Sequence, residues 1–411
     1  MNRRLLILIS SIIVFAGILF AVYFFVFAPG ASLTVGVPGN PFGSSTDRTG
    51  GDLPVPDGAP IQGAGRVVAP KLLRITEGPV AKGVAVLSLP EVIDESASTA
   101  TTTVATVAAE TEIRFVERQS GNIYTFRVHD RVLSRISNRT LPGVQEASWT
   151  NDGARAFVRY LTRAADGIEH VDTYSLPAEG GEGYFLEQDL EQVVVGSDNT
   201  VFSLLPTSTG SVGSLSAADG TNIRTLFTSV ISRLRTEFSG ENLIATTKAS
   251  SGLDGYSFLV SRASGSLTRI LGPMRGLATL PSPDGSHVLY SFSDRGKLAT
   301  QVLNLTTRTA TPLPLATLAE KCAWAPEGDA LYCAVPTTIT GNLPDNWYQG
   351  AQSFTDRIWY INLDTRLATL VVDPKQVGEV DIDAVALTLD SEADVLVFTN
   401  KRDGSLWVYD L

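Results

Sequence analysis

The two cysteines of the chain, Cys322 and Cys333, lie on either side of a turn in the segment KCAWAPEGDALYC. If the flanking segments pair as a β-hairpin, the register that sets Trp324 opposite Leu331 also sets Cys322 opposite Cys333. Opposed cysteines at a non-hydrogen-bonded position are close enough for a disulfide, which persists in an oxidising compartment. The sequence therefore predicts a disulfide, with two buried reduced cysteines as the alternative. A metal or redox role is disfavoured because no Cys-x-x-Cys spacing or histidine partner lies nearby.

Three histidines, His129, His170 and His287, are scattered along the chain without the spacing of metal ligands. We expect them to be surface or structural residues. The sequence contains no Gly-x-Ser-x-Gly elbow, no phosphate loop and no dinucleotide fingerprint. It therefore indicates no catalytic residue and predicts neither a metal nor a cofactor.

An aromatic insertion, TTITGNLPDNWYQGAQSFTD, is the best candidate for a contact surface. Trp347, Tyr348 and Phe354 stand there among polar residues, a composition that is favoured at binding hot spots. The alternative is that these side chains fold back and pack on their own part of the structure. The sequence thus names the three residues as candidate binding residues, with local packing as the alternative role.

The segment LATLPSPDGSHVLYSF belongs to a series of similar units, in each of which two alternating apolar runs flank a turn. Residues such as Asn-Asp-Gly and Pro-Asp-Gly suit a tight reversal, because they supply positive φ and side-chain hydrogen bonds to the backbone. One residue per turn serves as a marker, and the intervals between markers are 46, 43, 43, 43 and 64 residues. The markers are Asp152, Asp198, Glu241, Asp284, Glu327 and Ser391. Turn hydrogen bonding accounts for these acidic residues better than carboxylate catalysis or calcium binding does.

Four short antiparallel strands about every 43 residues are typical of a propeller blade. The last unit ends at Leu411 after three strands, which leaves an edge to be paired. We expect residues 71–76 to supply the missing strand by pairing with 405–411. The sequence thus predicts an all-β, seven-bladed propeller over 70–411, with six or eight blades as the alternative counts. Its first blade spans about 78–137 and carries a Ser/Thr/Ala-rich insertion at about 91–111.

The units SPDGSHVLYSF and APEGDALYCAV resemble the repeat of TolB-type propellers, which are related to the WD-repeat family. The resemblance extends over residues 71–411, although two units carry a near-ideal form of the repeat. In this family the fold implies a binding platform and does not identify the ligand.

The N-terminal segment is predicted to be a membrane anchor. Residues 5–27 form an uncharged stretch of 23 residues, which is long enough to span a bilayer. A cleaved signal is the alternative, but the stretch is longer than a typical signal core. Arg3 and Arg4 precede the stretch, so residues 1–28 are expected to have a cytoplasmic tip and the rest of the chain to lie outside the cytoplasm. Residues 28–69 hold six prolines and nine glycines, which predicts a flexible linker over 29–69.

The net charge of −11 and the thinly spread basic residues argue against nucleic acid as a partner. The first hypothesis is a non-enzymatic, membrane-anchored, extracytoplasmic propeller that acts as a protein-interaction or scaffold module for an envelope protein or ligand. The alternative is an enzyme or small-ligand-binding propeller whose site lies at the mouth of the central channel. An enzyme or ligand receptor should gather charged side chains with shifted pKa values there, whereas a scaffold should present an aromatic surface patch.

Overall fold

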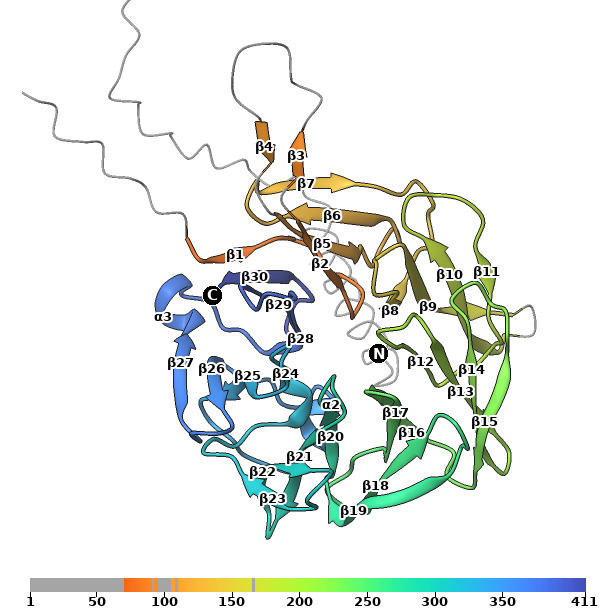
Figure 1. The fold of residues 1–411 in the computed structure, drawn as a ribbon, viewed down its shortest axis with the longest axis vertical. Coiled ribbons are helices and arrows are strands. Elements are labelled where there is room, and N and C mark those ends of the chain that lie inside the picture. The colour runs from red at the N-terminus through yellow and green to blue at the C-terminus, as the bar shows by residue number, and fades with distance from the viewer. Residues whose placement is uncertain (1–69, 91, 95–104, 108–109, 165–166) are drawn as a thin grey trace, which may run out of the picture. The chain divides into compact units, whose positions relative to one another are not determined.

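The computed structural model describes residues 70–411 except 91, 95–104, 108–109 and 165–166. Seven four-stranded antiparallel sheets are arranged in a ring, with one strand of each sheet nearest to the centre (Figure 1). The seven-bladed all-β propeller predicted from the repeats is therefore confirmed. The predicted anchor in 1–28 and the linker 29–69 lie outside the described residues, and within the described part no helix has the length and apolar character needed to span a membrane.

The strands of blades 1 to 4 follow one another along the chain from the inner to the outer edge of each sheet. Blade 1 has β2 (Ala85–Leu89), β5 (Glu110–Val116), β6 (Ile123–Arg127) and β7 (Val132–Arg135); blade 2 has β8 (Val144–Trp149), β9 (Arg155–Arg163), β10 (Glu169–Pro177) and β11 (Tyr184–Phe185); blade 3 has β12 (Gln192–Val195), β13 (Val201–Thr207), β14 (Gly210–Ser216) and β15 (Arg224–Ser229); blade 4 has β16 (Leu234–Ser239), β17 (Asn242–Thr247), β18 (Asp254–Ser261) and β19 (Leu267–Arg275).

Blades 5 and 6 repeat this order, and blade 7 takes its outer strand from the start of the domain. Blade 5 has β20 (Ala278–Pro281), β21 (His287–Asp294), β22 (Lys297–Asn304) and β23 (Ala310–Pro312); blade 6 has β24 (Cys322–Trp324), β25 (Ala330–Pro336), β26 (Asp356–Asn362) and β27 (Ala368–Val372); blade 7 has β28 (Ala384–Leu389), β29 (Val395–Asn400), β30 (Leu406–Asp410) and β1 (Leu72–Arg74).

The remaining elements lie between these strands. The insertion of blade 1 contains a two-stranded pair, and the aromatic insertion of blade 6 contains a short helix between β25 and β26. These elements are β3 (Val92–Asp94), β4 (Ala105–Val107), the 3-10 helix η2 (Ala319–Lys321), α2 (Asp345–Tyr348) and α3 (Pro374–Gly378).

The aspartates among the turn markers, Asp152, Asp198 and Asp284, make the backbone contacts expected of them. The Oδ1 atom of Asp284 accepts a hydrogen bond from the N–H of Ser286 at 3.1 Å. Gly285 has a φ of 77°, and a Cβ there would approach the carbonyl oxygen of Ser239 to 2.9 Å. In the last unit Asp390, one residue before the marker, takes this role by accepting from the N–H groups of Asp394 and Val395. Four of the six marked turns therefore use an aspartate carboxylate to hold the backbone.

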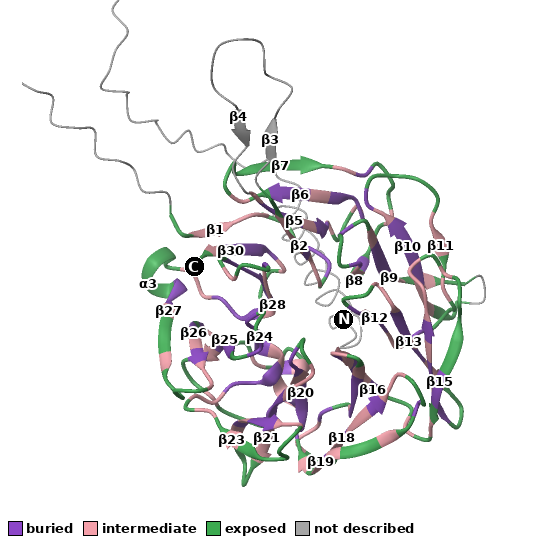
Figure 2. Ribbon diagram, viewed as in Figure 1, coloured by how far each residue is buried: buried purple, intermediate pink, exposed green. Residues whose placement is uncertain are grey.

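The hydrophobic core is divided among the contacts between neighbouring blades. One buried cluster, for example, contains Phe202 and Leu204 of blade 3 together with Leu243 and Ala245 of blade 4. Figure 2 shows that buried segments recur in every blade around the ring. Indole groups add to two contacts, since Trp149 donates to the carbonyl of Gly83 and Trp324 to that of Leu280, each in the preceding blade. Each blade is thus stabilised mainly by burial against its two neighbours.

The ring closes through β1 and β30, which join the two ends of the domain. Leu72 pairs with Tyr409, and Leu73 pairs with Val408 in an antiparallel register. Leu73 also packs against a buried cluster that contains Phe115 of blade 1. Because the first strand completes the last sheet, blade 7 has four strands like the other blades, and the two ends of the domain are held together.

Leu73→Ala is expected to lower the free energy of unfolding by about 1–3 kcal/mol, because it removes apolar contacts at the closure of the ring. The measurement is chemical unfolding of the purified full chain. Leu133→Ala is the matched control, since Leu133 is 48% exposed on the outer strand of blade 1. Equal unfolding free energies for the two variants would show that closure does not limit stability.

Candidate functional site

The aromatic residues of the blade 6 insertion lie inside the structure. Trp347 is 3% exposed and Phe354 is 2% exposed, and both belong to a buried cluster with Leu318 and Leu343. Tyr348 is partly buried and packs beside this cluster. The rings of Trp347 and Phe354 therefore do not form an aromatic surface patch, and their geometry favours the packing alternative.

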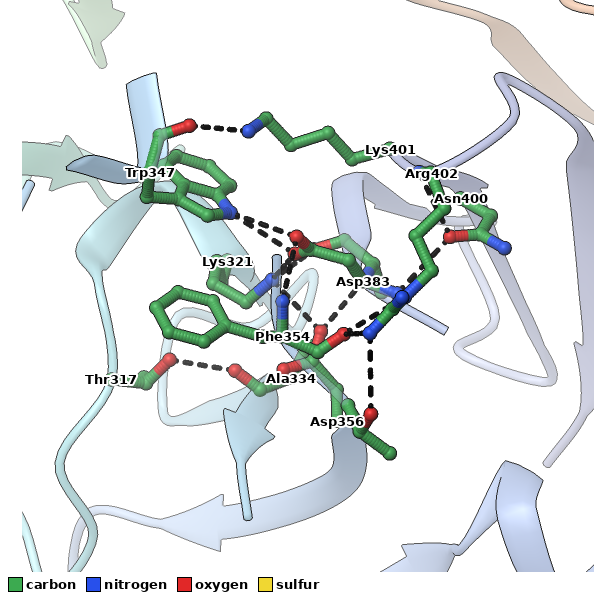
Figure 3. Close-up of polar contacts among 12 residues, drawn as sticks. Thr317, Lys321, Ala334, Trp347, Phe354, Asp356, Asp383, Asn400, Lys401 and Arg402 are labelled. Carbon is green, nitrogen blue, oxygen red and sulfur yellow. Dashed lines mark hydrogen bonds and ion pairs between the residues drawn. The ribbon is translucent and has the colours of Figure 1, made fainter. Parts of the chain in front are cut away.

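A cluster of buried charges holds the insertion in place (Figure 3). The ammonium of Lys321 lies 2.8 Å from Asp356 Oδ2 and 2.6 Å from Asp383 Oδ1, and all three side chains are buried. The indole N–H of Trp347 and the backbone N–H of Phe354 donate to Asp383. These contacts connect the insertion to the start of blade 7, so the position of α2 depends on the buried charges.

This cluster contains more negative than positive charge. Burial raises the pKa of Asp356 to about 6, although Lys321 opposes the shift. The second carboxylate oxygen of Asp356, Oδ1, is buried and has no hydrogen-bond partner among the described residues. Ionised Asp356 is therefore unfavourable in the folded protein.

A cavity of about 390 Å³ lies where the inner strands begin, at one mouth of the central channel. Its lining comes from blades 1 to 6 and is rich in charged and hydroxyl side chains. The lining residues are Lys82, Glu146, Glu191, Gln192, Arg233, Leu234, Arg235, Thr246, Thr247, Lys248, Ala249, Leu277, Ala278, Thr279, Glu320 and Tyr348. Tyr348 belongs to the blade 6 insertion, so the insertion borders the channel mouth.

Arg235, Glu320 and Tyr348 form the centre of this cavity wall. Arg235 Nη1 lies 2.5 Å from Glu320 Oε1, and Arg235 Nε lies 3.0 Å from Glu237 Oε1. The hydroxyl of Tyr348 donates to the same Glu320 oxygen. The side chains of Arg235 and Glu320 are 35% and 11% exposed, so the pair is partly screened by solvent on the cavity side.

The pKa values of Arg235, Glu320 and Tyr348 are shifted further from pH 7 than the ordinary values of these side chains. Burial disfavours charged Arg235, but Glu320 and Glu237 outweigh this effect and raise its pKa. Burial and the charge of Glu320 raise the pKa of Tyr348. Burial also disfavours ionised Glu320, but the charges of Arg235 and Lys82 hold its pKa below the ordinary value. At neutral pH Arg235 and Glu320 are therefore charged and Tyr348 is neutral.

The cavity arises from one position of the repeat. Six residues before the turn markers, at the start of the inner strands, stand Glu146, Gln192, Arg235, Ala278 and Lys321. The carboxylate of Glu146 accepts from Arg159, and the amide of Gln192 exchanges two hydrogen bonds with Thr236 of blade 4. In blade 5 the side chain is the small Ala278, so Arg235 of blade 4 reaches across to Glu320 of blade 6.

The sequence analysis did not identify this site, although a signal was present. Four of the five residues at the repeated position are polar or charged at the start of an otherwise apolar strand. The partners Glu320 and Tyr348 had no such signal, because only the closed ring brings blades 4 and 6 together.

The other residues singled out in the sequence lie elsewhere. Cys322 and Cys333 are directly opposed on β24 and β25 and form a disulfide within the core between blades 5 and 6. His129 contacts Glu110, His170 contacts Asp189, and His287 contacts Ser286 and Asn304. His129 and His170 thus make these contacts within their own blade or the loop next to it, whereas the ring of His287 also stacks on Trp324 of blade 6, with 6.1 Å between the ring centroids.

Comparisons with known proteins bear on the fold. No protein-family model matches the sequence, and no curated protein matches it significantly. Among solved structures, the β-propeller domain of the Trilobed protease from Pyrococcus furiosus is similar with 6% identity and a TM-score of 0.50, over 73% of this chain and 90% of that one. TolB from Acinetobacter baumannii is 14% identical with a TM-score of 0.42, over 62% of each chain. A prolyl endopeptidase is 13% identical with a TM-score of 0.46, over 71% of this chain and 45% of that one.

This chain thus matches less than two thirds of the TolB chain and less than half of the prolyl endopeptidase chain. The likeness to the propeller domain of the Trilobed protease shows a β-propeller fold, and at 6% identity it carries no activity with it.

Replacing both cysteines by alanine is expected to lower the free energy of unfolding by about 2–3 kcal/mol, because the crosslink restricts the unfolded chain. The measurement is urea unfolding of the full chain with and without reductant, and reductant should destabilise only the wild type. If thiol titration in non-reducing denaturant finds two free thiols per wild-type chain, the disulfide is absent.

Asp356→Asn is expected to become more stable relative to the wild type as the pH rises from 4 to 7. A carboxyl whose pKa is raised in the folded state contributes stability that is complete below its unfolded pKa of about 4 and is lost as the pH rises through the folded value. The relative gain is on the order of 2–3 kcal/mol for a shift of this size. The measurement is the unfolding free energy of both proteins at several pH values.

Asp381→Asn is the matched control with the opposite sign. A hydrogen bond from Lys375 lowers the pKa of Asp381, so its contribution is present above about pH 4 and is lost as the pH falls. Parallel stability curves for Asp356→Asn and the wild type would contradict a raised pKa for Asp356.

Proposed function

We propose that this protein is a non-enzymatic β-propeller receptor that is anchored in a membrane by its N-terminal segment and binds its ligand in the channel-mouth cavity. The observation that carries the proposal is the convergence of charged side chains from several blades on one cavity, among them Lys82, Arg233, Arg235, Lys248 and Glu320. Its volume of about 390 Å³ suits a small molecule or the end of a chain.

Binding is favoured over acid–base catalysis by the direction of the pKa shifts. A general acid or base works best with a pKa near the working pH. At the centre of this cavity the pKa of Glu320 is lowered, and those of Arg235 and Tyr348 are raised. Such groups keep their protonation state at neutral pH and are suited to hold a ligand by charge and hydrogen bonds.

A location outside the cytoplasm is part of the proposal. It is supported by the uncharged stretch at 5–27 with arginines before it, and by the disulfide between Cys322 and Cys333. The linker 29–69 would then hold the propeller away from the membrane surface.

An interaction with an envelope protein is the second candidate function. The same cavity could serve it, but only for a small part of the partner. The blade 6 insertion borders the cavity through Tyr348, while Trp347 and Phe354 are buried. A protein partner would therefore insert a chain end into the channel mouth instead of packing on exposed aromatic rings.

The test blocks the cavity by chemical labelling. Both native cysteines are held in the disulfide, so Glu191→Cys provides a single free thiol at the cavity wall, at a partly exposed residue with no proposed contact to the ligand. The full chain carrying a bulky maleimide at this position is incubated with a mixture of small metabolites and peptides, and retained molecules are identified by mass spectrometry. We expect the unlabelled variant to retain a ligand and the labelled one to lose most of it.

Thr306→Cys is the matched control, because Thr306 is exposed in a turn between β22 and β23 and lies outside the cavity lining. Labelling there should leave retention unchanged. If labels at both positions have the same effect, the binding site is not the channel mouth.

A further inference from the structure

Two positively charged side chains face each other at the edge of the channel-mouth cavity. Leu234 on β16 pairs with Thr247 on β17, and the same register continued by one residue sets Arg233 opposite Lys248. The backbone N–H of Lys248 donates to the carbonyl of Arg233 at 3.4 Å, which is consistent with this pairing. Both residues line the cavity and are exposed.

Like charges at directly opposed positions of an antiparallel pair are destabilising unless an opposite charge compensates them. In the part of the chain that the structure describes, neither Arg233 nor Lys248 has an ion-pair partner. Arg235, two residues along the same strand, lies against both Glu237 and Glu320. The repulsion at Arg233 and Lys248 is therefore uncompensated, whereas the charge next to it is neutralised.

The balance of charge over the whole cavity has the same sign. Glu146 is engaged by Arg159, and Glu320 is engaged by Arg235. Among the described residues, Lys82, Arg233 and Lys248 then remain without an ion-pair partner, against the single carboxylate of Glu191 in the same lining. Arg235 is shared between Glu320 and Glu237, so the four cations and three carboxylates of the lining leave an excess of one positive charge facing the cavity.

We propose that the cavity binds a compact anion, a dicarboxylate or a phosphate monoester, between Arg233 and Lys248. This inference rests on the proposed function and names the class of its ligand. The hydroxyl of Thr247 lines the same space and accepts a hydrogen bond from the N–H of Tyr256, so its own O–H is suited to donate to a further oxygen atom of such a ligand. The ligand supplies the negative charge that the opposed pair lacks.

The test uses the full chain in an uncharged detergent, titrated with inorganic phosphate and, separately, with succinate. We expect at least one of the two anions to bind by calorimetry and to raise the melting temperature. Binding of phosphate alone identifies the phosphate form of the ligand, and binding of succinate alone identifies the dicarboxylate form. Absence of binding by both anions overturns the proposal.

The double variant Arg233→Gln/Lys248→Gln separates a binding role from a structural one. We expect it to weaken anion binding about tenfold or more, because two charge-assisted contacts are lost. Without ligand it should melt no lower than the wild type, since the repulsion between the two cations is removed. A variant that melts lower and binds as tightly as the wild type would contradict the proposal.

Arg295→Gln/Lys297→Gln is the matched control, because it removes the same charge from the turn after β21 and the first residue of β22, both outside the cavity lining. This control variant should bind the anion with the affinity of the wild type. If both double variants bind the anion equally weakly, the loss of affinity comes from the lower net charge of the protein and not from the cavity. If labelling of the Glu191→Cys variant blocks retention of an uncharged molecule while neither anion binds, the ligand class is wrong and the receptor function stands. If the label has no effect, the receptor function itself fails.

Discussion

The whole domain depends on one constraint: each four-stranded blade has two apolar faces, and only the neighbouring blades can cover them. The buried clusters therefore lie between blades, as with Phe202 of blade 3 and Leu243 of blade 4. An open row of blades would leave two such faces in water. The pairing of Leu73 with Val408 closes the ring and brings blade 7 onto blade 1. Stability is thus distributed around the ring, and the centre is left to polar side chains.

The candidate binding site depends on which residue each repeat places next to the central channel. Most units place a polar or charged residue at the start of the inner strand, and a partner in the same or a neighbouring blade satisfies it, as Arg159 does for Glu146 and Thr236 for Gln192. In blade 5 the residue is Ala278, which leaves space that Arg235 crosses to reach Glu320. One small side chain in a repeated pattern therefore converts a closed set of inter-blade contacts into a cavity with uncompensated charge.

The blade 6 insertion is held by a different kind of interaction. Lys321 shares its ammonium between Asp356 and Asp383, and Asp383 in turn accepts from the indole of Trp347. Burying such charges is costly unless each finds a partner, so the geometry of the insertion is strongly specified. This anchoring places Tyr348 at the channel mouth, where its hydroxyl meets Glu320. A stabilising cluster in the core thus sets the shape of the proposed site.

The sequence by itself determined the β-propeller, its seven blades and the turns, because these depend on alternation and turn chemistry that recur every 43 or so residues. The register that opposes Cys322 and Cys333 is equally local, since a single turn specifies it. Only the tertiary structure decided that Trp347 is buried, because its partner Asp383 is 36 residues away. The same holds for Arg235 and Glu320, which the closing of the ring brings together across blade 5. Contacts between distant units depend on the geometry of the whole ring, and no periodicity along the chain encodes them.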